Sequence, residues 1–249
     1  MEIKTKTIAS TVEQQRRQDF LELYRKNPIP ENEQLSNLGV FTKRQDFTKQ
    51  LFFNEIYQQI VNVHGVIMEF GVRWGQNLVT LNNLRGIYEP YNYSRKLIGF
   101  DTFEGFPVID KKDGNHSIIE KGAFSVTHEY EKFLENALNY HEQECPLNHI
   151  QKNTLVKGDA TKTLEKYLQE HPETIIAFAY FDFDIYEPTK KCLELIKPHL
   201  TQGAIIGFDE LNDPQFPGET VALKEVFGVN NIAIKRNRFS GIQSYCVVS

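Results

Sequence analysis

From Gly65 to Val248, short apolar runs alternate with helical patterns, and this alternation limits the fold of the 249-residue chain more than any other feature. Stacked strand–helix–strand units form a mostly parallel sheet with helices on its faces. The expected strands are Val66–Phe70, Lys96–Asp101, Thr154–Lys157, Ile175–Phe181, Ala204–Phe208, Ile232–Lys235 and Gln243–Val248. The expected helices between them are Gln76–Leu84, Thr161–Glu170, Thr189–Leu200 and Glu219–Phe227.

The last two expected strands are joined by the turn Arg236–Gly241, which is too short to contain a helix. Strands connected so closely pair as an antiparallel hairpin, whereas parallel neighbours need a longer crossover. The sequence therefore predicts an α/β fold with a Rossmann-like sheet of seven strands, in which the final two strands are antiparallel and helices flank the sheet.

The first 50 residues are polar and form a separate region of the chain. One helix is expected over Thr11–Tyr24, before two prolines, and a second over Arg44–Val61, with its apolar residues on one stripe. We divide the chain into a helical extension, residues 1–50, and a main domain, residues 51–249. We expect the extension to pack on that domain or on a second subunit, which would give a homodimer or higher homo-oligomer.

The connection between the second and third expected strands is too long for a plain loop. It indicates an insert at about residues 108–150 of the main domain. Its polar segment Lys111–Asn115 is typical of a mobile loop. Functional loops lie at the C-terminal edge of sheets of this kind, so the insert is expected near the site.

Composition and charge exclude several functional classes. The net charge of −5 argues against a nucleic-acid partner, because such proteins usually carry a basic face. The three cysteines are far apart and odd in number, which argues against a disulfide framework or a zinc site and suits a reducing cytoplasm. The longest apolar run, Ile175–Phe181, is too short to span a membrane. We therefore expect a cytoplasmic protein with neither a membrane nor a nucleic acid as partner.

The first expected strand ends in the pattern Glu69-x-Gly71-x-x-x-Gly75. Glycines between a strand and a helix let the backbone turn tightly and approach a ligand. The glycine fingerprint of nicotinamide dehydrogenases is absent, and Glu69 suits the ammonium group of an amino acid better than a pyrophosphate. The alternative is a tight turn without a ligand.

Acidic residues also end the next two expected strands. Asp101 can accept hydrogen bonds from both ribose hydroxyls, or it can cap the following turn. Asp159 can accept from the amine of adenine while Ala160 lies against the ring, or it can cap the helix that begins near Thr161. Three adjacent strand ends that each carry an acid together predict an adenosine-type ligand.

The fourth and fifth expected strands end in a carboxylate cluster. Asp182 and Asp184 face the same side if their strand persists, and they would repel unless a cation lies between them or one of them keeps its proton. Asp209 and Glu210 follow the neighbouring strand. Asp182, Asp209 and Glu210 are therefore candidate ligands of Mg²⁺, which prefers carboxylate oxygens and water. The alternative is a solvated acidic rim.

This cluster predicts activation of an alcohol. An aliphatic hydroxyl holds its proton at neutral pH, and a bound divalent cation lowers its pKa while a nearby carboxylate accepts the proton. Asp184 is the first candidate for the base, and Asp182 is a candidate for both metal binding and catalysis.

Four segments carry a resemblance to a known family. They are EFGVRWG at Glu69–Gly75, DTFEGFP at Asp101–Pro107, DFDIYEPT at Asp182–Thr189, and Gly203–Glu210. With them, residues from about Phe47 to Val248 resemble the S-adenosylmethionine-dependent class I methyltransferases of the macrocin O-methyltransferase family. Phe183 stands where the family usually has glycine, and Glu210 where it often has aspartate.

The resemblance implies an Mg²⁺-dependent O-methyltransferase that acts on a hydroxyl of a sugar or glycosylated metabolite, such as a natural product or a surface polysaccharide precursor. It implies metal binding by Asp182, Asp209 and Glu210. It implies S-adenosylmethionine binding by Glu69, Phe70, Gly71, Gly75, Asn77, Asp101, Thr102, Asp159, Ala160 and Asp182.

Two other functions stay open at this stage. One is a metal-dependent hydroxylase of the cephalosporin hydroxylase type, although such iron enzymes typically use two histidine ligands. The other is a non-catalytic S-adenosylmethionine-binding module, which Phe183 and Glu210 would suit. The sequence does not name the acceptor, because fold alone does not set it.

Overall fold

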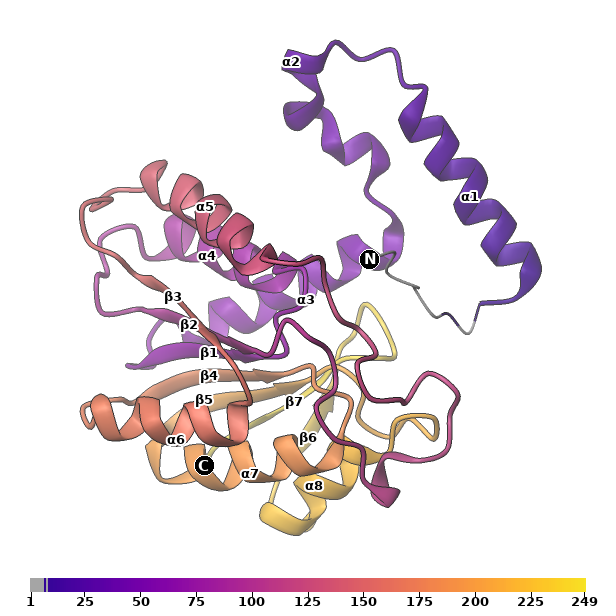
Figure 1. The fold of residues 1–249 in the computed structure, drawn as a ribbon. Coiled ribbons are helices and arrows are strands. Elements are labelled where there is room, and N and C mark those ends of the chain that lie inside the picture. The colour runs from indigo at the N-terminus through magenta and orange to yellow at the C-terminus, as the bar shows by residue number, and fades with distance from the viewer. Residues whose placement is uncertain (1–6, 8) are drawn as a thin grey trace.

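A seven-stranded sheet forms the centre of the computed structural model, which describes residue 7 and residues 9–249 (Figure 1). The strand order is β3-β2-β1-β4-β5-β7-β6, and all pairs are parallel except β5–β7 and β7–β6. The strands are β1 (Val66–Phe70), β2 (Leu97–Asp101), β3 (Asn153–Lys157), β4 (Ile176–Phe181), β5 (Leu200–Phe208), β6 (Ile234–Arg236) and β7 (Ser244–Val247). The predicted seven-stranded fold with an antiparallel final pair is confirmed.

Helices cover both faces of the sheet, as Figure 1 shows. One face carries α3 (Arg44–Ile60), α4 (Gln76–Tyr88) and α5 (Tyr130–Gln143). The other carries α6 (Ala160–Glu170), α7 (Tyr186–Ile196), the short helix η3 (Lys197–His199) and α8 (Gly218–Val226). The central strands are therefore buried on both sides, which is why they read as continuous apolar runs rather than as an alternating pattern.

Every residue of β4 is buried, and its neighbours supply aromatic rings to the core. On the side of α6 and α7, the ring of Phe70 stacks on Phe100 and on Phe181, with centroids 5.2 and 4.7 Å apart, and Phe181 stacks on Phe208 at 5.5 Å. These four residues lie at or next to the C-terminal ends of β1, β2, β4 and β5. The core thus fixes the strand ends, which carry the acidic residues.

The insert contains α5, which the sequence analysis did not predict. Its Leu134 and Leu138 are buried against the sheet domain. Its Glu142 is also buried and forms ion pairs of 2.5 Å with Arg85 of α4 and with Lys152, both almost fully buried. This network joins the insert to the N-terminal end of β3, at the edge of the sheet opposite the acidic strand ends.

The segment predicted as a mobile loop is anchored instead. It includes the short helix η2 (Lys111–Asp113), in which Asp113 is buried and accepts a hydrogen bond from the backbone N–H of Tyr186. Lys112 donates to the Tyr186 hydroxyl and pairs with Glu225 of α8 at 2.6 Å. The insert is therefore fixed against α7 and α8 at this point.

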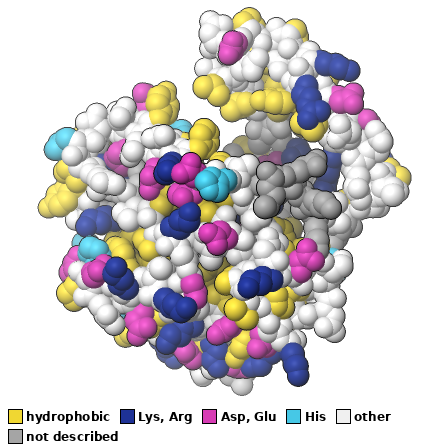
Figure 2. Space-filling view, viewed as in Figure 1, with side chains coloured by type: hydrophobic (Ala, Val, Ile, Leu, Met, Phe, Trp, Pro, Cys, Tyr) yellow, Lys and Arg dark blue, Asp and Glu magenta, His cyan; other side chains and the backbone are white. Residues whose placement is uncertain are grey.

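The N-terminal extension stands away from the sheet (Figure 1). It consists of α1 (Thr11–Arg25), α2 (Glu31–Gln34) and η1 (Leu35–Phe41), none of which has a buried residue. The rings of Phe20 and Tyr24 contact Phe41, so the extension packs mainly on itself. Figure 2 shows hydrophobic side chains on the surface of this lobe.

The proposed boundary at residue 50 falls inside α3, which continues into the core through Phe52, Phe53 and Ile56. The division into an extension and a main domain therefore stays a prediction about folding units. Among the helices of the described residues, none combines the length and the apolar character needed to cross a membrane.

Replacing Glu142 tests whether the insert depends on its buried ion pairs. Glu142→Ala leaves the charges of Arg85 and Lys152 buried without a carboxylate, so we expect the free energy of unfolding to fall by about 3–5 kcal/mol. Urea denaturation measures it, and Glu135→Ala on the exposed face of α5 is the control. A loss equal to that of the control would contradict the assignment.

Candidate functional site

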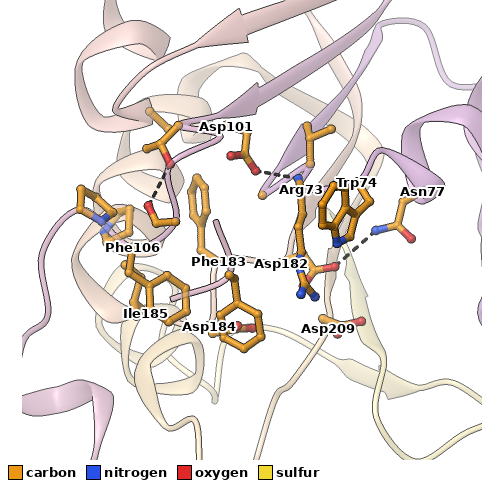
Figure 3. A pocket seen from close by; sticks show the side chains of 18 of the residues that line it. Arg73, Trp74, Asn77, Asp101, Phe106, Asp182, Phe183, Asp184, Ile185 and Asp209 are labelled. Atoms are coloured by element: carbon orange, nitrogen blue, oxygen red, sulfur yellow. Dashed lines mark hydrogen bonds between the residues drawn. The ribbon is translucent and has the colours of Figure 1, made fainter. Parts of the chain in front are cut away.

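A cavity of about 320 Å³ lies at the C-terminal edge of the sheet, where β1, β2, β3, β4 and β5 end (Figure 3). Parallel strands of an open α/β sheet place their ligands at this edge. The cavity collects most of the residues that the sequence analysis selected. They are Gly71, Gly75, Asn77, Asp101, Thr102, Asp159, Ala160, Asp182, Asp184, Asp209 and Glu210.

Two selected residues do not line the cavity. Glu69 and Phe70 are fully buried in β1 beneath it. Burial raises the pKa of the Glu69 carboxyl well above its ordinary value, and neither of its oxygens has a hydrogen-bond partner among the described residues. The structure therefore places Glu69 under the floor of the cavity rather than on its surface.

The two glycines of the first motif are required by packing. Gly71 has a φ of 94°, and a Cβ atom there would lie 2.1 Å from the backbone oxygen of Asp182. Gly75 has a φ of 78° where α4 begins, and its Cβ would lie 2.3 Å from the side chain of Leu134. Gly71 lets the ends of β1 and β4 approach, and Gly75 lets α5 pack on the start of α4.

Asp101 is held by backbone amides. Its Oδ2 accepts a hydrogen bond of 2.7 Å from the N–H of Arg73, and its Oδ1 accepts one of 2.5 Å from the N–H of Phe103. Burial raises the pKa of this carboxyl, while the backbone hydrogen bonds act to lower it. The hydrogen bond from Phe103 means that Asp101 caps the turn after β2, which was one of the two expectations. Its carboxylate also lines the cavity.

The third strand end shows the capping alternative for Asp159. Its Oδ1 accepts from the backbone N–H of Thr161 at 3.0 Å and from the Thr161 hydroxyl at 2.7 Å, which caps α6. Thr102 is also engaged, because its hydroxyl donates to the backbone oxygen of Gly105 at 2.8 Å. Both residues contribute to the cavity wall from these fixed positions.

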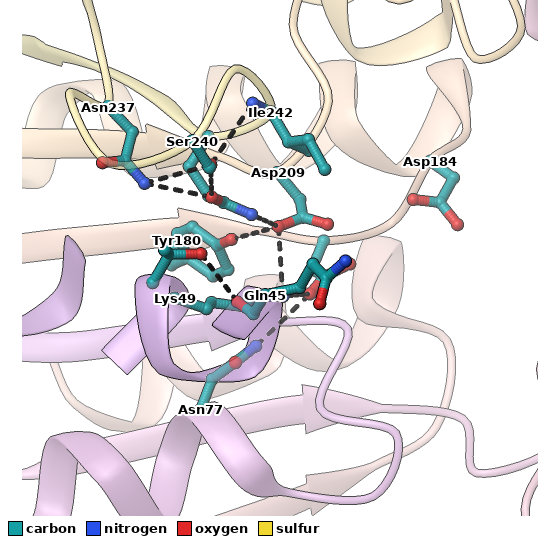
Figure 4. A network of polar contacts seen from close by, with 12 residues as sticks. Gln45, Lys49, Asn77, Tyr180, Asp184, Asp209, Asn237, Ser240 and Ile242 are labelled. Atoms are coloured by element: carbon teal, nitrogen blue, oxygen red, sulfur yellow. Dashed lines mark hydrogen bonds and ion pairs between the residues drawn. The ribbon is translucent and has the colours of Figure 1, made fainter. Parts of the chain in front are cut away.

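The centre of the carboxylate cluster holds Lys49 of α3 (Figure 4). Its Nζ lies 3.1 Å from Oδ2 of Asp182 and 3.0 Å from Oδ1 of Asp209. Asp182 also accepts from Asn77 at 3.3 Å. Asp209 also accepts from the Tyr180 hydroxyl at 2.6 Å and from Gln243 at 2.9 Å. The two carboxylates are therefore close enough to share one cation.

This environment moves the pKa values of the pair apart. Burial, with repulsion from Asp209, raises the pKa of Asp182 to about 6. Burial also acts on Asp209, but its contacts with Lys49, Gln243 and Tyr180 outweigh that effect and lower its pKa. Burial alone would lower the pKa of Lys49, and the two carboxylates raise it instead. Asp209 and Lys49 consequently form the firmly charged part of the cluster.

Asp184 does not continue the strand. β4 ends at Phe181, and Asp184 has a φ of 62°, so the expected same-face alternation with Asp182 does not apply. Oε1 of Glu219, which is fully buried in α8, accepts hydrogen bonds from the N–H groups of Phe183 at 3.1 Å and of Asp184 at 3.3 Å. Burial, with repulsion from Asp182, raises the pKa of Asp184 well above its ordinary value.

Three observations bear on a metal at this cluster. Among the described residues, no group of three His, Cys, Asp or Glu side chains is arranged to hold a metal ion. A cation nevertheless already lies between Asp182 and Asp209, namely the ammonium group of Lys49. Oε2 of Glu210 is buried without a hydrogen-bond partner, and burial with repulsion from Asp184 raises the pKa of this carboxyl to about 9.

The chemistry of these donors fits a hard divalent cation. Carboxylate oxygens are its preferred ligands, and the ammonium group marks where positive charge is stabilised between Asp182 and Asp209. No histidine is among the described residues that line the cavity. The donor set therefore differs from the two-histidine sites of the hydroxylase alternative.

Sequence reasoning missed several residues of the site. Lys49 was assigned to the extension, and Glu219 was read only as the start of a helix. The aromatic wall of the cavity was not recognised: Trp74 and Phe106 lie within two of the quoted motifs but were given no role, and Phe124 and Phe216 lie outside the motifs. An apolar helix stripe interrupted by one lysine was the available signal for Lys49, and no comparable signal pointed to Glu219.

Replacing Glu219 tests how the Asp184 segment is held. Glu219→Ala removes the acceptor of two amides, so we expect a loss of about 1–3 kcal/mol and faster hydrogen exchange at residues 183 and 184. Glu219→Gln keeps an oxygen acceptor and should retain slow exchange. Glu187→Ala, at an exposed position, is the control. Equal exchange in all these proteins would contradict this role.

Comparisons with known proteins agree with this geometry. No family model matches the chain, and no curated protein matches it. Among solved structures, CalS11, a calicheamicin methyltransferase, is 40% identical, with a TM-score of 0.93 over 99% of this chain and 96% of that chain. The apo structure of CalS11, described as TDP-rhamnose 3'-O-methyltransferase, is 38% identical, with a TM-score of 0.84 over 97% of this chain and 96% of that chain.

A more distant structure shows the same fold. The O-methyltransferase NovP is 16% identical, with a TM-score of 0.62 over 81% of this chain and 80% of that chain. The likeness to CalS11 extends over nearly the whole of both chains, so it includes the sheet, the cavity and the insert. The chain belongs to the S-adenosylmethionine-dependent class I O-methyltransferases of the macrocin O-methyltransferase type.

Proposed function

We propose that this enzyme transfers the methyl group of S-adenosylmethionine to a hydroxyl of a sugar that is carried on a nucleotide or within a glycosylated metabolite. The observation that carries the proposal is one cavity lined both by the acids at the ends of β2 and β3, Asp101 and Asp159, and by the carboxylates that follow β4 and β5. The identity to CalS11, which is named for a sugar nucleotide, supports the choice of acceptor.

The cofactor is proposed to lie over the ends of β1, β2 and β3. Asp101 would accept from the ribose hydroxyls, and Asp159 with Ala160 would meet the adenine. Both carboxylates are fixed by hydrogen bonds to backbone amides, so their orientation is set before the ligand arrives. Fixed donors and acceptors reduce the ordering that binding requires.

The acceptor is proposed to lie between the carboxylates and the aromatic wall. Arg73 stacks its guanidinium on the ring of Phe124, 4.9 Å from the ring centroid, and its buried Nε has no hydrogen-bond partner. A guanidinium group is well suited to phosphate oxygens. Trp74 and Phe106 offer apolar faces to a sugar or a base. These features favour a sugar that carries a phosphate group.

The proposed reaction is an in-line displacement. Asp184 accepts the proton of the acceptor hydroxyl, and the oxygen forms a bond to the methyl carbon as the bond from that carbon to sulfur breaks. The products are a methyl ether, S-adenosylhomocysteine and a proton. Burial raises the pKa of Asp184, which brings the base nearer to the pH at which it works. Glu219 holds Asp184 in position through the backbone, so alignment contributes to the rate.

Mg²⁺ dependence is part of the proposal. Asp182, Asp209 and Glu210 would hold the ion, which would lower the pKa of the acceptor hydroxyl. Asp182 would then serve in metal binding, and Asp184 would act as the base.

We also propose that the exposed apolar residues of the extension contact a second copy of this chain. Val12, Leu23, Leu35 and Val40 are each more than half exposed. A cytoplasmic location fits an enzyme whose donor and acceptor are intracellular metabolites, and it is likewise proposed.

Asp184→Asn tests the assignment of the base. Asparagine tolerates the left-handed backbone conformation at this position but accepts no proton. We expect turnover to fall by about 10²–10⁴-fold, while the affinity for S-adenosylmethionine, measured by calorimetry, stays unchanged. Asp19→Asn on exposed α1 is the matched control. Turnover within a few-fold of the parent enzyme would refute this role.

Removal of divalent cations tests the proposed metal. We expect EDTA to stop formation of S-adenosylhomocysteine from a pool of nucleotide sugars, and added Mg²⁺ to restore it. Binding of S-adenosylmethionine should persist in EDTA, because its proposed partners at β1–β3 do not include Asp209 or Glu210. Full turnover in EDTA would overturn the metal dependence and leave the methyl transfer itself intact.

A further inference from the structure

We propose that Lys49 is the resident cation of the Asp182–Asp209 pair, and that a divalent cation reaches these carboxylates by displacing its ammonium group. This inference rests on the metal dependence proposed above. It concerns a lysine outside the strand-end motifs, and it makes metal binding an exchange of one cation for another.

The geometry places a single cation between two strand ends. Nζ of Lys49 is 3.1 Å from Asp182 and 3.0 Å from Asp209, so the two oxygens lie no further apart than these distances laid end to end. Ligand oxygens lie about 2.1 Å from Mg²⁺, so a modest inward movement of the two side chains would enclose that ion. The ammonium group and the divalent cation therefore need the same space.

The cluster keeps its shape when the ammonium group leaves. Tyr180 and Gln243 donate to Asp209, and Asn77 donates to Asp182, so neutral groups orient both carboxylates (Figure 4). Neutral donors do not cancel the two negative charges of Asp182 and Asp209, which lie close together in a partly buried site. A positive charge is therefore needed both with and without the metal. Lys49 provides it in the metal-free protein, and the divalent cation provides it after the exchange.

Both cations have access to the position. The side chains of Lys49, Asp182 and Asp209 are 23%, 22% and 15% exposed, and all three line the cavity. The long methylene stem of Lys49 starts from α3, with Nζ 5.7 Å from the centre of the Tyr180 ring. Rotation about that stem moves the ammonium group into the cavity without movement of the helix.

A third oxygen is available for the incoming ion. Glu210 follows Asp209 directly in the chain, and its Oε2 is buried without a hydrogen-bond partner in the part of the chain that the structure describes. Lys49 makes no ion pair with Glu210 among those of the described residues. A dication with three carboxylates has the same net charge, −1, as the ammonium group with two, and Glu210 releases its proton to solvent when it becomes the third ligand.

The experiment measures metal affinity without donor or acceptor. Mn²⁺ is titrated into the full-length protein, and free Mn²⁺ is followed by electron paramagnetic resonance. Lys49→Met keeps the apolar stem and removes the competing charge, so we expect Mn²⁺ to bind about tenfold more tightly or better. Lys49→Arg keeps the charge and should show no gain. Lys43→Met removes an exposed lysine that pairs with Asp46 and is the matched control.

Thermal unfolding keeps the proposal testable if Lys49→Met folds poorly. We expect this variant to melt at a lower temperature than the parent protein without metal, and to gain more from added Mn²⁺ than the parent does. An affinity in Lys49→Met that is equal to or weaker than the parent's would overturn the exchange, even where EDTA stops turnover. Failure of both proteins to bind Mn²⁺ would also overturn it, and the EDTA assay decides the metal dependence separately.

Discussion

The site depends on how negative charge is compensated where parallel strands end. The sheet brings acidic side chains from five strands to one edge and removes most of the surrounding water. Each of them needs a partner or a retained proton, because an isolated buried carboxylate ion is strongly disfavoured. Lys49 supplies a full positive charge to Asp182 and Asp209, and backbone amides serve Asp101. The resulting set is rigid enough to receive a ligand in a defined orientation.

The architecture was largely predictable because its signals are local. A buried strand is an apolar run, and the acids at its end meet those of its neighbours in any parallel sheet. The seven strands, the final hairpin and the acids that line the cavity follow from these rules. One helix start was predicted too late. Helix α7 begins at Tyr186 rather than at Thr189, because Pro188 is tolerated in the first turn of a helix.

The remainder depends on contacts between distant parts of the chain. Helix α5 was missed although Tyr130, Leu134 and Leu138 recur every four residues, but the pairing of its Glu142 with Arg85, 57 residues away, could not be read from that pattern. Lys49 meets Asp182 across 133 residues. The left-handed conformation of Asp184 is held by Glu219 of another helix. Hydrophobic periodicity records none of these pairings, because each concerns one polar atom rather than a repeated face.

The continuity of α3 has a practical consequence for anyone who shortens this protein. A chain that starts at residue 51 would keep Phe52, Phe53 and Ile56, whose burial anchors the helix to the sheet. It would therefore be expected to look well folded by spectroscopy. It would also lack Lys49, and the two carboxylates that this lysine joins would face each other with nothing positive between them. Truncation at the apparent domain boundary would thus change the charge of the reactive centre while the fold is retained.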